Sequence, residues 1–338
     1  MLRLGAPLSL SGVFARFGRQ AAAGLRAWRS IRGADVEVMI EDDESDPARV
    51  RQCIRRLASS CDVLLGPYSG TLMRAAAAAL SDSGILLWNH GGAADDVQRR
   101  PGAGIVSVLT PASRYSQPLL RHLSGLANVE RLLIVHGRGG FAQQVSAGAG
   151  SAARREGMQV EYLLAGPPWT QPTVASRRAD HLVLLCAGSF EEDLQSVSWV
   201  RSWSRQPVVV CAVAAGVREF GGRFRDPIGV LGIAQWIAGG RSRPQVGPAE
   251  EQFIEAYRGL TGSAPDYPAA QAAAAAALAI HCIEAAGSTD SKAVWKAAVD
   301  TRTRTFFGEF AVDKESGEQT THSTVLTVWA REGLSRAK

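Results

Sequence analysis

The sequence predicts a two-domain α/β protein in which short parallel strands alternate with amphipathic helices. Its 338 residues exceed what one ordinary hydrophobic core organises, and they suit two domains of roughly 100–200 residues each. The candidate strands are short and largely apolar on both faces, as strands are when helices cover both sides of a parallel sheet. Regular alternation of such strands with helices implies doubly wound layers.

The predicted elements follow one another through two such sets. The strands are expected at Leu2–Leu8, Val36–Ile40, Val63–Leu65, Ile85–Trp88, Arg131–His136, Gln159–Leu164, His181–Cys186, Pro207–Val213 and Ile228–Ile233. The helices between them are expected at about Phe17–Ile31, Ala48–Ser59, Thr71–Ser83, Tyr115–Leu126, Phe141–Arg155 and Glu191–Ser204. The first set closes near Thr110 and the second starts at Val129, which indicates one sheet in each domain.

The last third of the chain departs from this alternation. Beyond Gly239–Pro248, helices follow in succession at about Ala249–Thr261, Tyr267–Ala286 and Ser291–Asp300. A final extended pair, Thr305–Val312 and Thr324–Ala330, is expected to form either a hairpin or two crossings between the domains. Residues 313–317 between them have the composition of a turn.

The composition argues against nucleic acid and membrane insertion. The formal net charge is +5, but arginines such as Arg49 and Arg55 are scattered over helices and form no stripe with aromatics between them. The alanine-rich run Ala269–Ala279 is about half the length of a membrane span. Met1 leads straight into the first strand without a signal peptide. The protein is therefore expected to be cytoplasmic, or periplasmic or extracellular if a signal peptide has been removed.

The cysteines and histidines predict neither a disulfide framework nor a metal centre. The five cysteines are odd in number and lack C-x-x-C spacing. Cys53 and Cys61 flank the end of one helix, but a bond between them is not expected. The six histidines form no paired motif at helical spacing. No cofactor is expected.

Two glycine-rich segments resemble catalytic motifs without matching them. In Gly66-Pro67-Tyr68-Ser69-Gly70 the serine stands one place too late for the G-x-S-x-G elbow, and Ser69 fits the N-cap of the next helix better. Residues 137–140 lack the G-x-G-x-x-G spacing of a dinucleotide loop. The chain is therefore not expected to be an enzyme, and the remaining alternative is a hydrolase that uses Ser69 with His90.

The acidic segment Asp42-Asp43-Glu44-Ser45-Asp46-Pro47 has two interpretations. Paired carboxylates can perform acid–base chemistry or bind a hard cation. A helix cap is favoured, because Ser45 or Asp46 stands directly before a proline at the first position of a helix.

Ligands of open α/β sheets bind at the carboxyl ends of the strands. The loops at those ends are expected at Ser9–Phe17, Gly66–Thr71, Asn89–Ala94, Gly137–Phe141, Ala187–Phe190 and Ala212–Val217. Phe17 and Phe141 begin helices after such loops, and His90 lies within one. Contact with a ligand and ordinary core packing remain alternatives for all three side chains.

Several of these segments together resemble one known family. The opening Leu8-Ser9-Leu10-Ser11-Gly12, the turn Asp43-Glu44-Ser45-Asp46-Pro47, and the later segments Leu64-Leu65-Gly66-Pro67, Gly84-Ile85-Leu86-Leu87, Pro265-Asp266-Tyr267-Pro268-Ala269-Ala270 and Phe306-Phe307-Gly308 follow in the order and approximate spacing of that family. It is the leucine/isoleucine/valine-binding type of periplasmic binding protein, with the type I solute-binding fold. The resemblance covers nearly the whole chain.

The resemblance implies two Rossmann-like lobes joined by three crossovers, which close on one small ligand by hinge motion. The expected lobes are residues 1–112 with 240–320, and residues 113–239 with 321–338. The implied function is the substrate-binding component of an ABC importer, with an ABC permease as partner and a monomer or weak dimer as the assembly. A cytoplasmic ligand sensor of the same fold is the alternative.

The resemblance also implies which residues line the ligand. The backbone N–H groups of Gly91 and Ala93 are expected to hold an oxyanion, although Ala93 stands where the family has a threonine. Asn89 and His90 are implied polar anchors. The remaining expected contacts are Ser69, Gly70 or Thr71 from the loop before them, and Phe17, Phe141, Ser189 and Phe190 as aromatic and flanking contacts.

One departure from the family concerns the ammonium group of an amino-acid ligand. The family's amino-acid binders place a carboxylate after the strand that matches Val208–Cys211. Here that segment is Cys211-Ala212-Val213-Ala214-Ala215-Gly216, where Ala214 is expected to line the ligand and no acid is present. A buried ammonium without a counter-charge costs several kcal/mol. Among amino-acid-like ligands, amides and aromatic carboxylates, the last two are therefore favoured.

Overall fold

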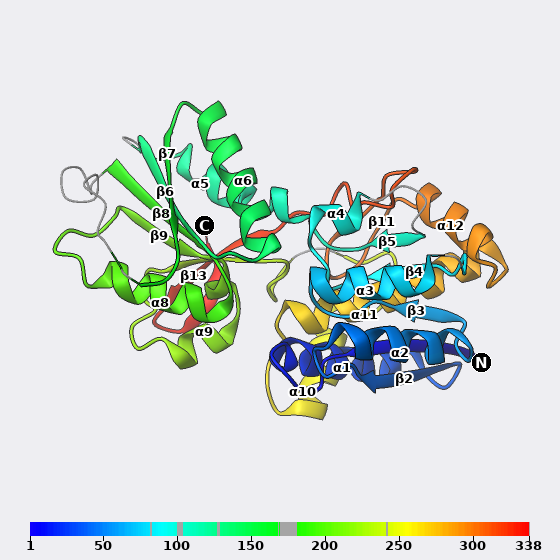
Figure 1. Cartoon of the computed structure of the whole chain (residues 1–338). Coiled ribbons are helices and arrows are strands. Elements are labelled where there is room, and N and C mark those ends of the chain that lie inside the picture. Colours follow the sequence, from blue (N-terminus) through cyan, green and yellow to red (C-terminus); the bar gives the residue numbers. More distant parts are fainter. Residues whose placement is uncertain are drawn as a thin grey trace. The chain divides into compact units, whose positions relative to one another are not determined.

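The computed structural model describes residues 1–81, 83–99, 104–126, 129–167, 169, 181–240 and 243–337. The chain forms two compact units (Figure 1). Unit 1 comprises Met1–Pro111 and Ala238–His322, and unit 2 comprises Ala112–Ile237 and Ser323–Lys338. The chain therefore passes from one unit to the other three times, as the predicted fold class requires.

Unit 1 is built on a five-stranded sheet with the order β2-β1-β3-β4-β5. The pairings β1–β2, β1–β3, β3–β4 and β4–β5 are all parallel. The strands are β1 Leu2–Leu8, β2 Val36–Asp42, β3 Val63–Leu65, β4 Leu87–Asn89 and β5 Ile105–Ser107. This order winds outward from β1 in both directions, so all carboxyl ends meet at one edge.

Helices cover both faces of the sheet of unit 1. They are α1 Ala15–Arg32, α2 Pro47–Ala58, α3 Gly70–Leu80, α4 Asp95–Gln98, α10 Glu250–Thr261, α11 Tyr267–Ala286 and α12 Ser291–Asp300. One buried cluster joins the apolar sides of α2 and α3 to strand residues such as Leu64, Leu87 and Ile105. Helix α11 packs closely on α1 and also touches β3 and β4.

Helix α11 corrects one expectation from the sequence. We expected no apolar run of membrane-spanning length, but Tyr267–Ala286 is long and apolar enough by length and composition. The structure buries this helix on nearly all sides within unit 1. A helix that is hydrophobic all round is typical of the centre of a packed domain, which explains its composition.

Unit 2 is built on a seven-stranded sheet with the order β14-β13-β10-β9-β8-β6-β7. The strands are β6 Arg131–His136, β7 Gln159–Leu164, β8 Leu182–Ala187, β9 Val209–Ala212, β10 Leu231–Ala234, β13 Val325–Ala330 and β14 Gly333–Arg336. The strands from β7 to β10 pair in parallel, whereas β13 pairs antiparallel with β10 and with β14. Strand β8 is buried at every residue, as expected for a strand covered on both faces.

The described helical segments of unit 2 are two 3₁₀ turns and four α-helices. They are the 3₁₀ turns η1 Ala112–Arg114 and η3 Val213–Gly216, and the helices α5 Gln117–Leu123, α6 Gly140–Arg155, α8 Phe190–Arg201 and α9 Arg218–Arg223. The core on one side of the sheet contains Trp203, Phe220 and Trp329. The indole N–H of Trp329 donates to the Ala215 carbonyl at 2.9 Å, which satisfies its polar atom inside this core.

Most predicted elements are present, and the differences have local causes. Strand β5 was not predicted, because three residues carry too little pattern to be recognised. The predicted helix Tyr115–Leu126 is shorter in the structure: α5 covers Gln117–Leu123, and Pro118 lies in its first turn, where proline is favoured. The hairpin alternative for the final extended pair is wrong. Strands β11 Thr303–Arg304 and β12 Glu309–Phe310 pair within unit 1, whereas β13 lies in the sheet of unit 2.

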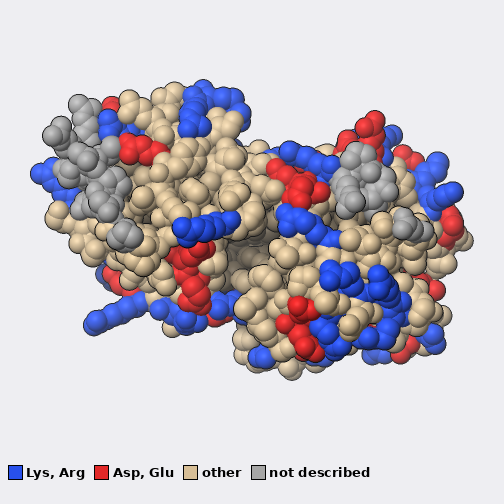
Figure 2. All heavy atoms as spheres, in the orientation of Figure 1, with Lys and Arg blue, Asp and Glu red and all other residues tan. Residues whose placement is uncertain are grey.

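Surface charge and cysteines follow the sequence-based expectations. On the face shown in Figure 2, Lys and Arg side chains lie in several groups with Asp and Glu among them. Ion pairs such as Arg56–Glu41 and Arg74–Asp96 account for part of this mixing. All five cysteines, including Cys53 and Cys61, are free in the structure.

Glycine at position 24 sets the distance between α1 and α11. A Cβ atom at Gly24 would meet the backbone of Ala269, whereas a Cβ at Gly259 in α10 would meet nothing. We therefore expect Gly24→Ala to lower the free energy of unfolding by about 1–3 kcal/mol. The control Gly259→Ala should raise it by about 0.5–1 kcal/mol, because alanine favours a helix. Urea unfolding measures both, and equal effects would contradict close packing at Gly24.

Candidate functional site

The first loop at the carboxyl edge of unit 1 is held by the acidic segment that follows β2. The Ser9 hydroxyl donates to Asp43 at 2.6 Å. The backbone N–H groups of Leu10 and Ser11 donate to one Asp42 oxygen at 2.9 and 3.2 Å, and the Ser11 hydroxyl donates to the other. The two carboxylates therefore shape the loop that follows β1.

The same acidic segment also caps α2, as the sequence predicted. Asp46 accepts the backbone N–H groups of Ala48 and Arg49, both at 2.8 Å. Burial alone would raise the pKa of Asp42, but hydrogen bonds from the backbone of Glu44 and from Ser11 outweigh it, so this pKa is lowered. For Asp43 burial prevails, and its pKa is raised. Among the described residues no group of His, Cys, Asp and Glu is arranged to hold a metal ion.

The loops after β3 and β4 are fastened to each other. The Ser69 N–H donates to the Gly91 carbonyl at 3.0 Å, and Tyr68 forms a β-bridge with Gly91. A Cβ at Gly91 would meet the backbone of Tyr68, and one at Gly70 would meet Ala94, so both glycines permit close approach. The structure thus brings Ser69, Gly70 and Gly91 together, as the sequence analysis expected.

Ser69 serves as a helix cap in a strained conformation. Its φ of 87° lies in a region that side chains other than glycine rarely adopt. Its hydroxyl oxygen accepts the Leu72 N–H at 3.3 Å at the start of α3. Thr71 follows on the exposed side of this turn. Backbone strain of this kind occurs at binding sites, where the surrounding structure fixes it.

Asn89 shapes the loop that follows β4. Its amide nitrogen donates to the Gly92 carbonyl and to the Ser107 hydroxyl, each at 2.9 Å, and its amide oxygen accepts the Gly92 N–H at 2.8 Å. The side chain is fully buried. The amide of Asn89 therefore organises the loop that carries Gly91 and Ala93.

His90 is fully buried beside Asn89, and neither ring nitrogen has a hydrogen-bond partner. Burial lowers its pKa to about 4, and the nearby Gly66 backbone opposes this weakly without reaching hydrogen-bonding geometry. The ring is therefore neutral near pH 7. It makes no hydrogen bond to Ser69, so the nucleophile–base couple of the hydrolase alternative is not assembled.

Aromatic rings border this edge of unit 1. Phe17, in the first turn of α1, stacks on Tyr68 with ring centroids 4.5 Å apart. The hydroxyl groups of Tyr68 and Tyr267 are 2.9 Å apart. Sequence reasoning named Phe17 but missed both tyrosines. Tyr267 lies in a segment that carried the family resemblance, and Tyr68 directly follows another, which was the signal available for finding them.

The carboxyl edge of unit 2 carries its own aromatic and capping residues. Phe141, in the first turn of α6, packs edge-on against Tyr115 at 5.2 Å. Ser189 caps α8 in a capping box, in which its hydroxyl accepts the Glu192 N–H and Glu192 accepts the Ser189 N–H. Phe190 is partly buried against the core of unit 2.

A buried carboxylate, which sequence reasoning missed, joins two strand-end loops of unit 2. Asp193 accepts the Gly188 N–H after β8 at 2.7 Å and the Ala214 N–H after β9 at 2.8 Å. Its side chain is 1% exposed, and burial raises its pKa to about 7. The backbone of Ala214 is thus bound to this carboxylate. Its position within a run of acids at the start of a helix was the one available signal.

These units belong to a known class of proteins. Residues 2–176 match the model of the periplasmic binding protein family, and this is more than half of the chain. The chain therefore belongs to that family, and the predicted two-unit fold is confirmed.

Solved structures show the same fold over the whole chain. A leucine-binding protein, LivK, from Thermotoga maritima is 16% identical with a TM-score of 0.81, and the match covers 100% of this chain and 98% of that one. LivJ from Streptococcus pneumoniae, in complex with isoleucine, is 16% identical with a TM-score of 0.76 and coverages of 100% and 99%. A solute-binding protein from Rhodopseudomonas palustris, in complex with 3,4-dihydroxybenzoic acid, is 14% identical with a TM-score of 0.78 and coverages of 99% and 95%.

The raised pKa of Asp193 predicts a distinctive pH dependence. Between pH 3.8 and about 7 the folded protein holds a proton that the unfolded chain has released, so raising the pH lowers the free energy of unfolding. Asp193→Asn should lower this free energy by about 1–3 kcal/mol at pH 5, because its NH₂ group faces a backbone N–H. The deficit should shrink towards pH 8, where only the wild type buries a charge. Denaturant unfolding across this range measures it, and a growing deficit would contradict the raised pKa.

His90 predicts the opposite pH dependence. Below pH 6.5 the unfolded chain takes up a proton that the buried ring refuses until about pH 4, so the free energy of unfolding falls as the pH falls. His90→Leu removes this contribution and two buried nitrogens without partners. Unfolding curves should place the variant within about 1 kcal/mol of the wild type at pH 7 and make it relatively more stable at pH 5. A constant difference at both pH values would show that the ring is not buried in neutral form.

Proposed function

We propose that this protein is the substrate-binding component of an ABC importer and binds one small ligand with its strand-end loops. The family match over residues 2–176 carries the proposal. An ABC permease would sense the ligand-bound conformation, because binding shifts the population towards that conformation. The same proposal includes that the protein acts outside the cytoplasm and catalyses no reaction.

The geometry at the two edges supports a binding role. The loops after β1, β3 and β4 are fixed by hydrogen bonds within unit 1, and a pre-organised site loses less entropy when it binds. Backbone groups of Gly91 and Ala93, with Ser69, Gly70 and Thr71, are proposed to hold the polar end of the ligand. His90 is fully buried and makes no hydrogen bond to Ser69, so it is not placed to activate that hydroxyl for hydrolysis.

The ligand is proposed to be an aromatic carboxylate or an amide. The 3₁₀ turn Val213–Gly216 after β9 contains no acid, and the nearby carboxylate of Asp193 already accepts two backbone N–H groups. An amino-acid ammonium would therefore lack a counter-charge at this position. Phe17, Phe141 and Phe190 are proposed to contact the ring or apolar body. Structural neighbours include proteins in complex with benzoate and with leucine, so both ligand classes occur on this fold.

A thermal-shift screen followed by calorimetry tests this proposal. We expect benzoate, 3,4-dihydroxybenzoate or benzamide to raise the melting temperature, and leucine and isoleucine to leave it unchanged, because a ligand stabilises the form that it binds. Phe17→Ala should weaken binding by about tenfold through lost ring contact. Tyr162→Ala is the matched control, since Tyr162 is an exposed aromatic on the edge strand β7 and is not among the proposed ligand contacts.

The outcomes separate ligand class from function. Tight binding of leucine without binding of aromatic acids or amides would overturn the ligand class and leave the transport role intact. Turnover of a ligand that Ser69→Ala abolishes would overturn the binding role itself.

A further inference from the structure

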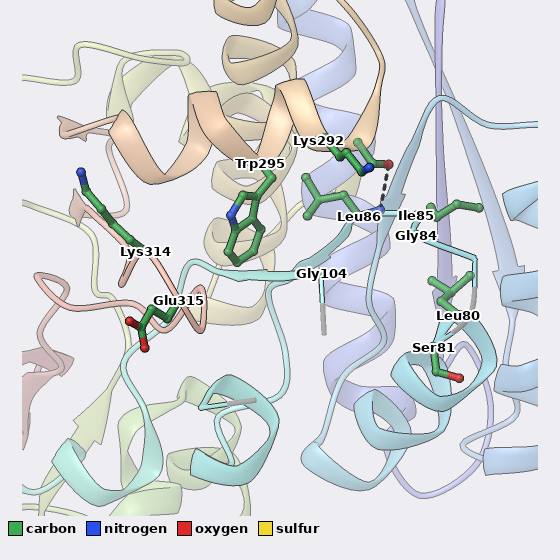
Figure 3. A pocket seen from close by; sticks show the side chains of 11 residues that line it. Leu80, Ser81, Gly84, Ile85, Leu86, Gly104, Lys292, Trp295, Lys314 and Glu315 are labelled. Carbon is green, nitrogen blue, oxygen red and sulfur yellow. Dashed lines mark hydrogen bonds between the residues drawn. The ribbon is translucent and has the colours of Figure 1, made fainter. Parts of the chain in front are cut away.

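A hollow of about 300 Å³ opens at the surface of unit 1, at the sheet edge opposite the strand-end loops (Figure 3). Leu86 and Gly104, which line it, stand directly before β4 and β5 and so mark the amino ends of these strands. Helix α12 and the turn after β12 contribute further walls. The hollow lies within one unit and is independent of the ligand site proposed above.

The first wall is the amino end of α12, which is fixed to the sheet. Asp290 caps the helix by accepting the N–H groups of Lys292 and Ala293 at 3.1 and 3.0 Å. The Ser291 hydroxyl accepts the Leu86 N–H at 3.2 Å, which is the dashed line in Figure 3. The first turn of α12 is thereby held against the segment before β4.

The opposite wall is the turn that carries Lys314 and Glu315. The Asp313 carboxylate accepts the N–H groups of Glu315 and Ser316 at 3.1 and 2.8 Å. Gly317, at φ +74°, lies so close to Ile105 and to the Trp295 ring that a Cβ atom would collide. The Ser107 N–H donates to the Gly317 carbonyl at 3.0 Å. Both walls therefore exist without a ligand.

The lining combines a flat apolar surface with one available cation. Trp295 is half-buried, and its indole ring lies between the two walls in Figure 3, with Leu80 and Leu86 across from it. Lys292 is exposed and forms no ion pair within the described part of the chain. Lys314 already lies 3.6 Å from Asp300. The positive charge that remains for a ligand is therefore that of Lys292.

Helix direction brings the start of α12, with Lys292, to this edge of the sheet. In a βα unit the helix begins at the carboxyl edge of the sheet, but α12 begins at the amino edge beside Leu86. The Asp290 carboxylate accepts the first N–H groups of α12 and offsets the positive dipole end, so the positive charge offered to a ligand remains that of Lys292. Glu315 lies on the other side of Trp295 from Lys292 in Figure 3 and would repel a second negative charge.

We propose that this hollow binds a planar aromatic monocarboxylate, with the ring on Trp295 and Leu80 and the carboxylate at Lys292. Such a ligand has one negative charge, which fits beside Lys292. Its other end is uncharged and apolar, so Glu315 does not repel it. The site is small and open, so binding is weak, in roughly the millimolar range expected of a fragment-sized ligand.

Titration with benzoate, followed by NMR of the tryptophan indole N–H signals, tests the proposal. The Trp295 signal is assigned from Trp295→Phe, and it should shift and saturate. Lys292→Gln should weaken this binding at least about fivefold, because a charge-assisted contact is lost. Lys296→Gln is the matched control on the same helix, since Lys296 faces Asp300 and does not line the hollow. Benzyl alcohol should bind less tightly than benzoate.

The Phe17→Ala variant separates this site from the one proposed at the strand ends. Its Trp295 signal should respond to benzoate as in the wild type, whatever happens to the other site. A Trp295 shift that does not saturate, that persists unchanged in Lys292→Gln, or that disappears in Phe17→Ala would overturn the proposal.

Discussion

The structure depends on how the chain leaves a parallel sheet at the carboxyl ends of its strands. There the backbone N–H groups lose their partners in the sheet, and buried peptide groups without hydrogen bonds are costly. Side-chain oxygens replace those partners: Asp42 after β1, Asp43 after β2, Asn89 after β4, and Asp193 after β8 and β9. Asp42 joins its own loop to the loop after β1, and Asp193 joins the loops after β8 and β9. Asn89 stands at the start of the loop that it binds.

This constraint decides which groups remain for a ligand. The carboxylates each accept two or more hydrogen bonds, and the Asn89 amide uses both its nitrogen and its oxygen, so these side chains set the loop conformation. Recognition then falls to backbone groups, to hydroxyls such as that of Thr71, and to the aromatic rings around Phe17. Such a site suits a ligand with one polar end and an apolar body.

The sequence predicted the fold well, because periodicity and strand-bounding turns carry that information locally. Strands such as β1 and β6, and helix α11, lie where the pattern placed them. Strand β5 was missed because three residues show no period. The roles of Asp193 and Tyr68 were missed for another reason: each depends on a partner brought near by the fold, and composition does not encode that proximity.

The two ends of the sheet in unit 1 differ in their electrostatics, and the difference follows from helix direction. At the carboxyl edge the buried titratable side chain His90 is neutral, and the carboxylates of Asp42 and Asp43 are bound by hydrogen bonds. Helix α11 starts at the carboxyl edge, where Tyr267 meets Tyr68, and runs to the amino edge. Helix α12 then starts at the amino edge beside Leu86, whereas a helix of a βα unit starts at the carboxyl edge. A helix start and an exposed lysine therefore meet at an edge that a simple βα repeat would leave negative. The helices after Pro248 depart from the alternating pattern, and they thus place a helix start and the Lys292 ammonium at this edge.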